Sequence, residues 1–308
     1  MHEANSAVTA LASIQAAEHH VETEYEEEFD VPRIMATVTE DATFIKVDKQ
    51  GGVETAVTDK DVWAFYERLR LNFKPMGTIH LGQVVTDWYT FFESVPRRLD
   101  AKTGKTYRTS TAALFPTIGG RIAGEINCEI PPDYDGSPSI PSAQALAVNH
   151  ACAYETFVSH LVTGNVQAAG RMMHPEGSIV VRHGLLASCA EIGHFAGAKG
   201  QADFLGQFAA AIEDVEVCML NRLVNGWMVF SEVLISGRLK APVRRLMAGN
   251  RVTYAEAHIA AFDPGSRLRQ LIMYSSKLRV TGWKQGVAHG GRGPLRAGRA
   301  DHGGGKLE

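Results

Sequence analysis

A tyrosine, a glutamate and a histidine in the second half of the chain have side chains suited to proton transfer. Tyr154 shares the apolar stripe of a predicted helix over 142–162, which turns its side chain inward. Glu232 and His258 are the polar members of otherwise apolar rows in two later strands. Burial raises the pKa of a glutamate, and a histidine beside it keeps one proton mobile. The three residues therefore predict an acid–base site.

Each of these residues also has a structural explanation. Tyr154 is as well explained by a core position in which backbone groups satisfy its hydroxyl. Glu232 and its counterpart Glu93 in the first half would instead form hydrogen bonds across a contact between two sheets. The first half has Thr111 at the place we assign to His258, so we predict the complete set in the second half alone.

Acidic residues also stand at the turn into the first long strand of each half. These are Asp41 in the first half and Glu176, with His174 close by, in the second. A carboxylate at such a turn, with apolar walls around it, would have a raised pKa and act as a base. Plain solvation of a helix–strand turn is the alternative explanation.

The sequence predicts neither a metal site nor a cofactor. His19 and His20 have no further histidine at ligand spacing. The four cysteines are widely spaced without a C-x-x-C pair, which favours reduced thiols over zinc ligands. Glycine-rich dinucleotide and phosphate-binding motifs, zinc-protease motifs and serine-hydrolase motifs do not occur.

Composition narrows the class of partner. The 31 basic and 34 acidic residues give a net charge of −3 without a dominant basic face, which argues against nucleic acid. The start of the chain lacks the features of a signal peptide or a membrane span, so we expect a cytoplasmic protein. We predict that the partner is a small hydrophobic molecule, with a homo-oligomer as a further expectation.

A repeated motif indicates the elements that must position these residues. The pattern W-x-x-F-x-E occurs at 88–93 and again at 227–232. Helices followed by strands precede each copy, so the repeating unit is a compact α+β module. The segment 131–141 is dense in Pro, Ser, Asp and Gly and is typical of a linker. We therefore expect modules at 1–130 and 142–280, followed by a disordered tail at 281–308.

The expected elements follow the same order in both modules. The first should contain a helix over 6–29, a short helix after Pro32, a helix over 61–73 capped by Thr58, and then strands. The second should contain helices over 142–162 and 201–212, a short helix ending near 173, a strand at 178–183 and later strands.

Order and motifs together resemble the SnoaL-like branch of the nuclear-transport-factor-2-like superfamily. The resemblance is clearest over 197–205, which is similar to the family's helix entry, and over 225–237, which is similar to its G-x-x-V hairpin. It covers about residues 6–280 in two tandem copies. It implies, for each copy, a cone formed by a curved antiparallel sheet wrapped around about three helices, with an apolar pocket inside.

The resemblance implies a class of chemistry without fixing one reaction. Its members often use a tyrosine on the first helix to bind a substrate oxygen, which would be the role of Tyr154, and carry an acidic residue at the pocket rim, as at Asp41 and Glu176. We expect a cofactor-independent lyase that performs elimination, dehydration or retro-aldol cleavage on an aromatic or polycyclic molecule. An isomerase or cyclase, or a non-catalytic binding or accessory subunit, is the alternative.

Overall fold

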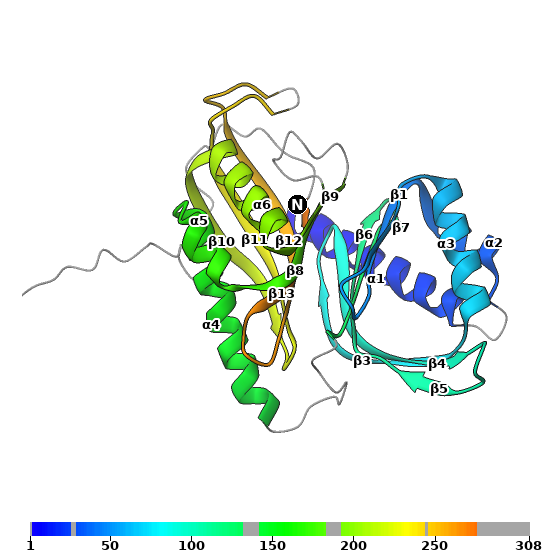
Figure 1. Cartoon of the computed structure of the whole chain (residues 1–308). Helices are drawn as coiled ribbons and strands as arrows, with labels where there is room; N and C mark the ends of the chain where they lie inside the picture. Colours follow the sequence, from blue (N-terminus) through cyan, green and yellow to red (C-terminus); the bar gives the residue numbers. More distant parts are fainter. Residues whose placement is uncertain (1, 26–28, 132–141, 183–191, 244–245, 276–308) are drawn as a thin grey trace, which may run out of the picture.

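The computed structural model describes residues 2–25, 29–131, 142–182, 192–243 and 246–275. Within these ranges the chain forms two sheets, each with its own helices (Figure 1). The predicted tail at 281–308 lies outside the described residues, as does the predicted linker apart from Pro131.

The first module begins with helices and continues with strands, as expected. Its elements are α1 (His2–Glu24), α2 (Val31–Ala36), β1 (Val38–Val47), β2 (Val53–Ala56), α3 (Asp59–Asn72), β3 (Phe73–Val85), β4 (Tyr89–Asp100), β5 (Thr106–Arg108), β6 (Thr111–Ile118) and β7 (Arg121–Glu129). Thr58 caps α3 by accepting a hydrogen bond from the Asp61 amide, which confirms the predicted cap, although the helix begins at Asp59 and not at 61.

The second module repeats this order. Its elements are α4 (Ser142–Val162), α5 (Val166–Arg171), β8 (Met173–Arg182), β9 (Ile192–Ala196), α6 (Gly197–Ala211), β10 (Ile212–Val224), β11 (Met228–Leu239), β12 (Arg251–Phe262) and β13 (Leu268–Ser275). None of the helices in the described ranges has the length and apolarity needed to span a membrane.

The two sheets have the same strand order. It is β2-β1-β7-β6-β4-β3 in the first module, with β5 paired to β4, and β9-β8-β13-β12-β11-β10 in the second. Neighbouring strands are antiparallel except for one parallel pair in each sheet, β1 with β7 and β8 with β13. The fold is therefore two tandem α+β modules.

The modules meet through their sheets, and we call this contact the seam. A buried cluster there combines residues of both sheets, including Phe91 and Phe230, whose rings stack with centroids 3.9 Å apart. The helices pack instead against the opposite face of each sheet, where they enclose a separate interior in each module. Alternation along each strand therefore sends one side chain to the seam and the next to an interior.

Candidate active site

The interior of the second module holds two of the three predicted acid–base residues in direct contact. The Tyr154 hydroxyl from α4 lies 2.7 Å from His258 Nδ1 on β12. His258 Nε2 lies 2.8 Å from a carboxylate oxygen of Glu256, whose other oxygen accepts from Ser275 Oγ at 2.6 Å. All four side chains are buried. Burial also raises the pKa of Tyr154, so its hydroxyl stays protonated.

Glu232 does not join this group, because the strand register turns it the other way. Residues directly opposite one another in a ladder share a face, and His258 lies opposite Ser231 whereas Glu232 lies opposite Ala257. Glu232 therefore points into the seam. There it accepts hydrogen bonds from Trp88 Nε1 at 2.9 Å and from the Tyr89 hydroxyl at 3.1 Å. Glu232 therefore lies where the alternative explanation, a contact between the two sheets, would place it.

Glu93 makes the reciprocal contact from the first module. It accepts hydrogen bonds from Trp227 Nε1 at 3.2 Å and from the Asn225 side chain. Burial raises the pKa of Glu93. Each W-x-x-F-x-E motif thus supplies a tryptophan and a glutamate that pair with those of the other copy, so the repeated motif builds the seam.

The remaining predicted residues lie apart from both interiors. Glu176 is 78% exposed and forms a surface ion pair with Arg269, which also contacts His174. Asp41 is exposed and borders a crevice at the seam, together with Trp88 and Glu232. The structure does not bring these three predicted residues together with Tyr154 or His258. Their catalytic roles stay predictions.

A second polar cluster fills the base of the first module's interior. His20 from α1 is fully buried, and its Nε2 lies 3.0 Å from the Tyr66 hydroxyl of α3, 3.6 Å from a Glu24 oxygen and 3.9 Å from a Glu125 oxygen. The Tyr66 hydroxyl is also 3.1 Å from Glu125. We call His20, Glu24, Tyr66 and Glu125 the acid cluster.

Hydrogen bonds define the proton positions on His20. The Thr37 hydroxyl donates to the Ile34 carbonyl at 2.7 Å, so it accepts from His20 Nδ1 at 2.6 Å. Nε2 therefore faces Tyr66 and the carboxylates. Burial by itself would lower the pKa of His20, but the carboxylates of Glu125 and Glu24 outweigh it and the pKa is raised.

Glu24 is a largely buried carboxyl whose pKa lies near neutrality. Burial, followed by repulsion from the Glu125 carboxylate, raises the pKa of Glu24 to about 7. Tyr66 has a pKa well above its ordinary value, also because of burial first, and remains a hydrogen-bond donor. The acid cluster thus combines a carboxyl that can gain or lose a proton near neutral pH with His20 and Tyr66, whose raised pKa values favour their protonated forms.

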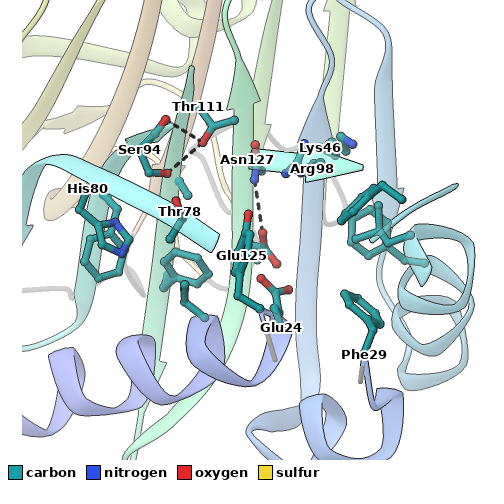
Figure 2. A pocket seen from close by; sticks show the side chains of 18 residues that line it. Glu24, Phe29, Lys46, Thr78, His80, Ser94, Arg98, Thr111, Glu125 and Asn127 are labelled. Carbon is teal, nitrogen blue, oxygen red and sulfur yellow. Dashed lines mark hydrogen bonds between the residues drawn. The ribbon is translucent and has the colours of Figure 1, made fainter. Parts of the chain in front are cut away.

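A cavity of about 50 Å³ opens above the acid cluster. Glu24 and Glu125 reach it, whereas His20 and Tyr66 lie behind them and position them. Figure 2 shows Glu24 and Glu125 side by side below Asn127, with Lys46 and Arg98 on one flank. Five phenylalanine rings contribute to the remaining wall: Phe29, Phe65, Phe73, Phe92 and Phe115.

The position that corresponds to Glu125 is apolar in the second module. Ile126 on β7 and Ile272 on β13 both lie in the seam, and the residue before each faces the interior. That residue is Glu125 in the first module and Leu271 in the second. Leu271 packs with residues of α4 and α6 in a continuous apolar cluster. The acid cluster is thus a property of the first module.

His20, Glu24 and Glu125 are also the described residues best placed to hold a cation. Their ligand atoms all lie within 4.8 Å of one another, and the hydrogen bond from His20 Nδ1 orients Nε2 toward the carboxylates. Protons bound to His20 and Glu24 can offset the negative charge of this group in place of a metal ion, because the pKa values of both residues are raised.

The acid cluster is absent from the residues predicted from sequence, although signals for it exist. His20 lacks a second histidine at ligand spacing, but Glu24 lies one helical turn away on the same face. Tyr66 follows Val62 at the same spacing in α3, and both are buried.

The predicted correspondence between Thr111 and His258 was wrong. The register places Ala113 opposite Phe92, just as His258 lies opposite Ser231, so Ala113 is the counterpart of His258.

Solved structures similar to parts of this chain share low sequence identity with it. One is assigned as a SnoaL-like polyketide cyclase from Jannaschia sp. CCS1, at 12% identity and a TM-score of 0.37, covering 46% of this chain and 92% of that one. A ketosteroid isomerase-like protein from Erwinia carotovora has 17% identity and a TM-score of 0.32, covering 40% and 96%. An NTF2-like protein from Anabaena variabilis has 19% identity and a TM-score of 0.33, covering 42% and 91%. No protein-family model and no curated protein matches the sequence.

Proposed function

We propose that the first module is a small-molecule enzyme that moves protons by general acid–base catalysis, as a lyase or an isomerase. The observation that carries the proposal is the pair Glu24 and Glu125 at the base of an aromatic-walled cavity, with His20 and Tyr66 behind them. Glu24 would take a proton from carbon beside a substrate carbonyl and return it to another atom. The pKa of Glu24, about 7, suits both directions.

The substrate's developing negative charge also has a partner in the cavity. Arg98 and Lys46 line the wall and would stabilise an enolate oxygen formed when Glu24 removes the proton. Elimination of a β-hydroxyl and migration of a double bond both begin with this step. A lyase of this kind is our first choice, and an isomerase using the same residues is the alternative.

The cavity limits the size of the substrate. Its 50 Å³ holds about three or four waters, well below the 300–1,000 Å³ of pockets for drug-sized ligands. We therefore favour a short substrate over the polycyclic molecule expected from sequence. An aromatic ring would have to extend toward the partly exposed residues at the mouth, Lys46, Thr78 and His80.

Deuterium exchange at carbon tests this proposal with simple carbonyl compounds. The full chain is incubated in deuterated water with a panel of short ketones and β-hydroxy carbonyl compounds, and exchange or elimination is followed by proton NMR. Glu24→Gln should lower the rate about 10²- to 10⁴-fold. Glu22→Gln, an exposed change on the same helix, should leave it unchanged, as should a chelator. Equal rates for both variants would contradict the proposal.

The second module offers a rival site. Tyr154, His258 and Glu256 form a continuous hydrogen-bonded chain that could relay a proton. Neither the cavity above the acid cluster nor the crevice at the seam is lined by Tyr154 or His258. In the same assay, loss of turnover in Tyr154→Phe with full turnover in Glu24→Gln would move the chemistry to the second module. Binding without turnover in any variant would favour the non-catalytic alternative.

A further inference from the structure

One flank of the first module's cavity carries two positively charged side chains. Lys46 Nζ and Arg98 Nη1 approach the same oxygen of Glu129, at 3.6 and 3.4 Å. Two cations therefore share one carboxylate. Tyr25, Tyr107 and Glu24 are further polar residues near Arg98, and burial raises the pKa of Tyr25 to about 12, so its hydroxyl remains neutral.

Arg98 is an expensive residue to bury unless something binds it. Its side chain is only 8% exposed, and the Phe73 ring lies 4.7 Å below the guanidinium carbon and fixes its plane. Arg98 Nε is buried without a hydrogen-bond partner among the described residues, and so is Asn127 Oδ1. Both residues line the cavity. A buried donor without an acceptor costs about 1–3 kcal/mol, which a bound anion would offset.

We infer that this flank binds the carboxylate of a short carboxylic acid. The positive charges of Lys46 and Arg98 supply attraction, and Arg98 Nε supplies a directed donor in the guanidinium plane that matches a planar carboxylate. The aromatic walls take the hydrocarbon part of the ligand. Its far end then lies toward Glu24 and Glu125, so the cavity distinguishes the two ends of its ligand by charge (Figure 2).

The second module has no arginine at the position that corresponds to Arg98, and this difference supports the proposed carboxylate site in the first module. Arg98 lies five residues after Glu93, and the residue five after Glu232 is Gly237. A side chain at Gly237 would be crowded, because its Cβ would lie 2.9 Å from the backbone oxygen of Glu213 and 2.7 Å from Ile212 Cγ1. The arginine and the acid cluster therefore occur together in the first module. This coincidence is expected if one ligand contacts both.

The inference deepens the proposed function, but its test requires no turnover. Binding of butyrate and of its uncharged analogue butyramide to the full chain is compared by ligand-observed NMR titration. Butyrate should bind more tightly, and Arg98→Gln should weaken its binding about 10- to 100-fold while leaving that of butyramide nearly unchanged. Arg97→Gln is the matched control, because Arg97 is the exposed neighbour on the same strand and carries the same charge.

Two outcomes would overturn the inference. One is equal affinity for butyrate and butyramide in the unaltered chain, a measurement that does not depend on any variant folding. The other is an equal loss of butyrate binding in Arg97→Gln and Arg98→Gln, which would indicate a general charge effect. Preferential butyrate binding together with a silent Glu24→Gln in the exchange assay would separate a correct ligand class from a wrong reaction.

Discussion

Glu24 and Glu232 are both glutamates in largely apolar surroundings, yet their neighbours give them different chemistry. Glu232 accepts hydrogen bonds from Trp88 and Tyr89 across the seam. Burial, and then repulsion from the Glu125 carboxylate, raises the pKa of Glu24 to about 7. A buried carboxyl therefore indicates an acid–base role only when its partners leave a proton to exchange.

The pKa of Glu24 predicts how stability depends on pH. Its folded value of about 7 exceeds the ordinary 4.5, so its contribution is complete below pH 4.5 and is lost as the pH rises through 7. The unfolding free energy should fall between pH 5 and pH 8, and Glu24→Gln should make this fall smaller by on the order of 2 kcal/mol. Urea titrations at the two pH values measure this. An unchanged difference, equal to that of Glu22→Gln, would show that Glu24 titrates normally.

Single residues were also where prediction from sequence was weakest. The contact between Tyr154 and His258 could be anticipated, because helical and strand periods turn both side chains inward. The acid cluster draws on α1, α3 and β7, and Glu125 is 101 positions from Glu24 in the sequence. No local pattern encodes such a distance. Only the strand register and the helix packing bring these side chains within hydrogen-bonding reach.

At the scale of elements, β11 and β12 show how one ladder separates two environments. Glu232 and Ala257 face the seam, whereas Ser231 and His258 face the second module's interior. Sequence parity identified the apolar row on each strand correctly. It could not say which rows share a face, because a shift of one residue in register exchanges the faces.

Coupling between mutations can test this separation. Trp88→Phe removes the donor of one hydrogen bond and Glu232→Gln replaces its charged acceptor by a neutral one, so their effects on unfolding free energy should be non-additive by about 0.5–3 kcal/mol. Tyr154→Phe and Glu232→Gln act on opposite faces and should add within about 0.5 kcal/mol. Chemical unfolding of the single and double variants gives both values. Strong coupling between Tyr154 and Glu232 would contradict the assigned faces.

At the scale of the molecule, the seam joins the two modules into one unit. It contains stacked rings of Phe91 and Phe230 and the reciprocal tryptophan–glutamate contacts. The two-module fold was predictable because W-x-x-F-x-E is repeated in sequence. The role of this motif in the seam was not predictable, since the same pattern is equally consistent with a strand whose polar residue faces a pocket.

The seam should hold the modules together without a covalent connection. Proteolytic cleavage within 132–141 is expected to leave two fragments that co-elute in size-exclusion chromatography, because the apolar cluster and both glutamates remain in place. The double variant Glu93→Gln, Glu232→Gln should weaken this association measurably after the same cleavage. Immediate separation of the unaltered fragments would show that the chain connection, and not the seam, maintains the assembly.

The reciprocal contacts at the seam have a consequence for how the two halves can change. In an assembly of two identical chains, every substitution appears twice, so one interior cannot be altered without altering the other. Here each half is encoded separately while the shared contact is kept. Leu271 can then stand where its counterpart is Glu125, and Gly237 where its counterpart is Arg98. Each half can therefore keep a buried charged group that the other half lacks.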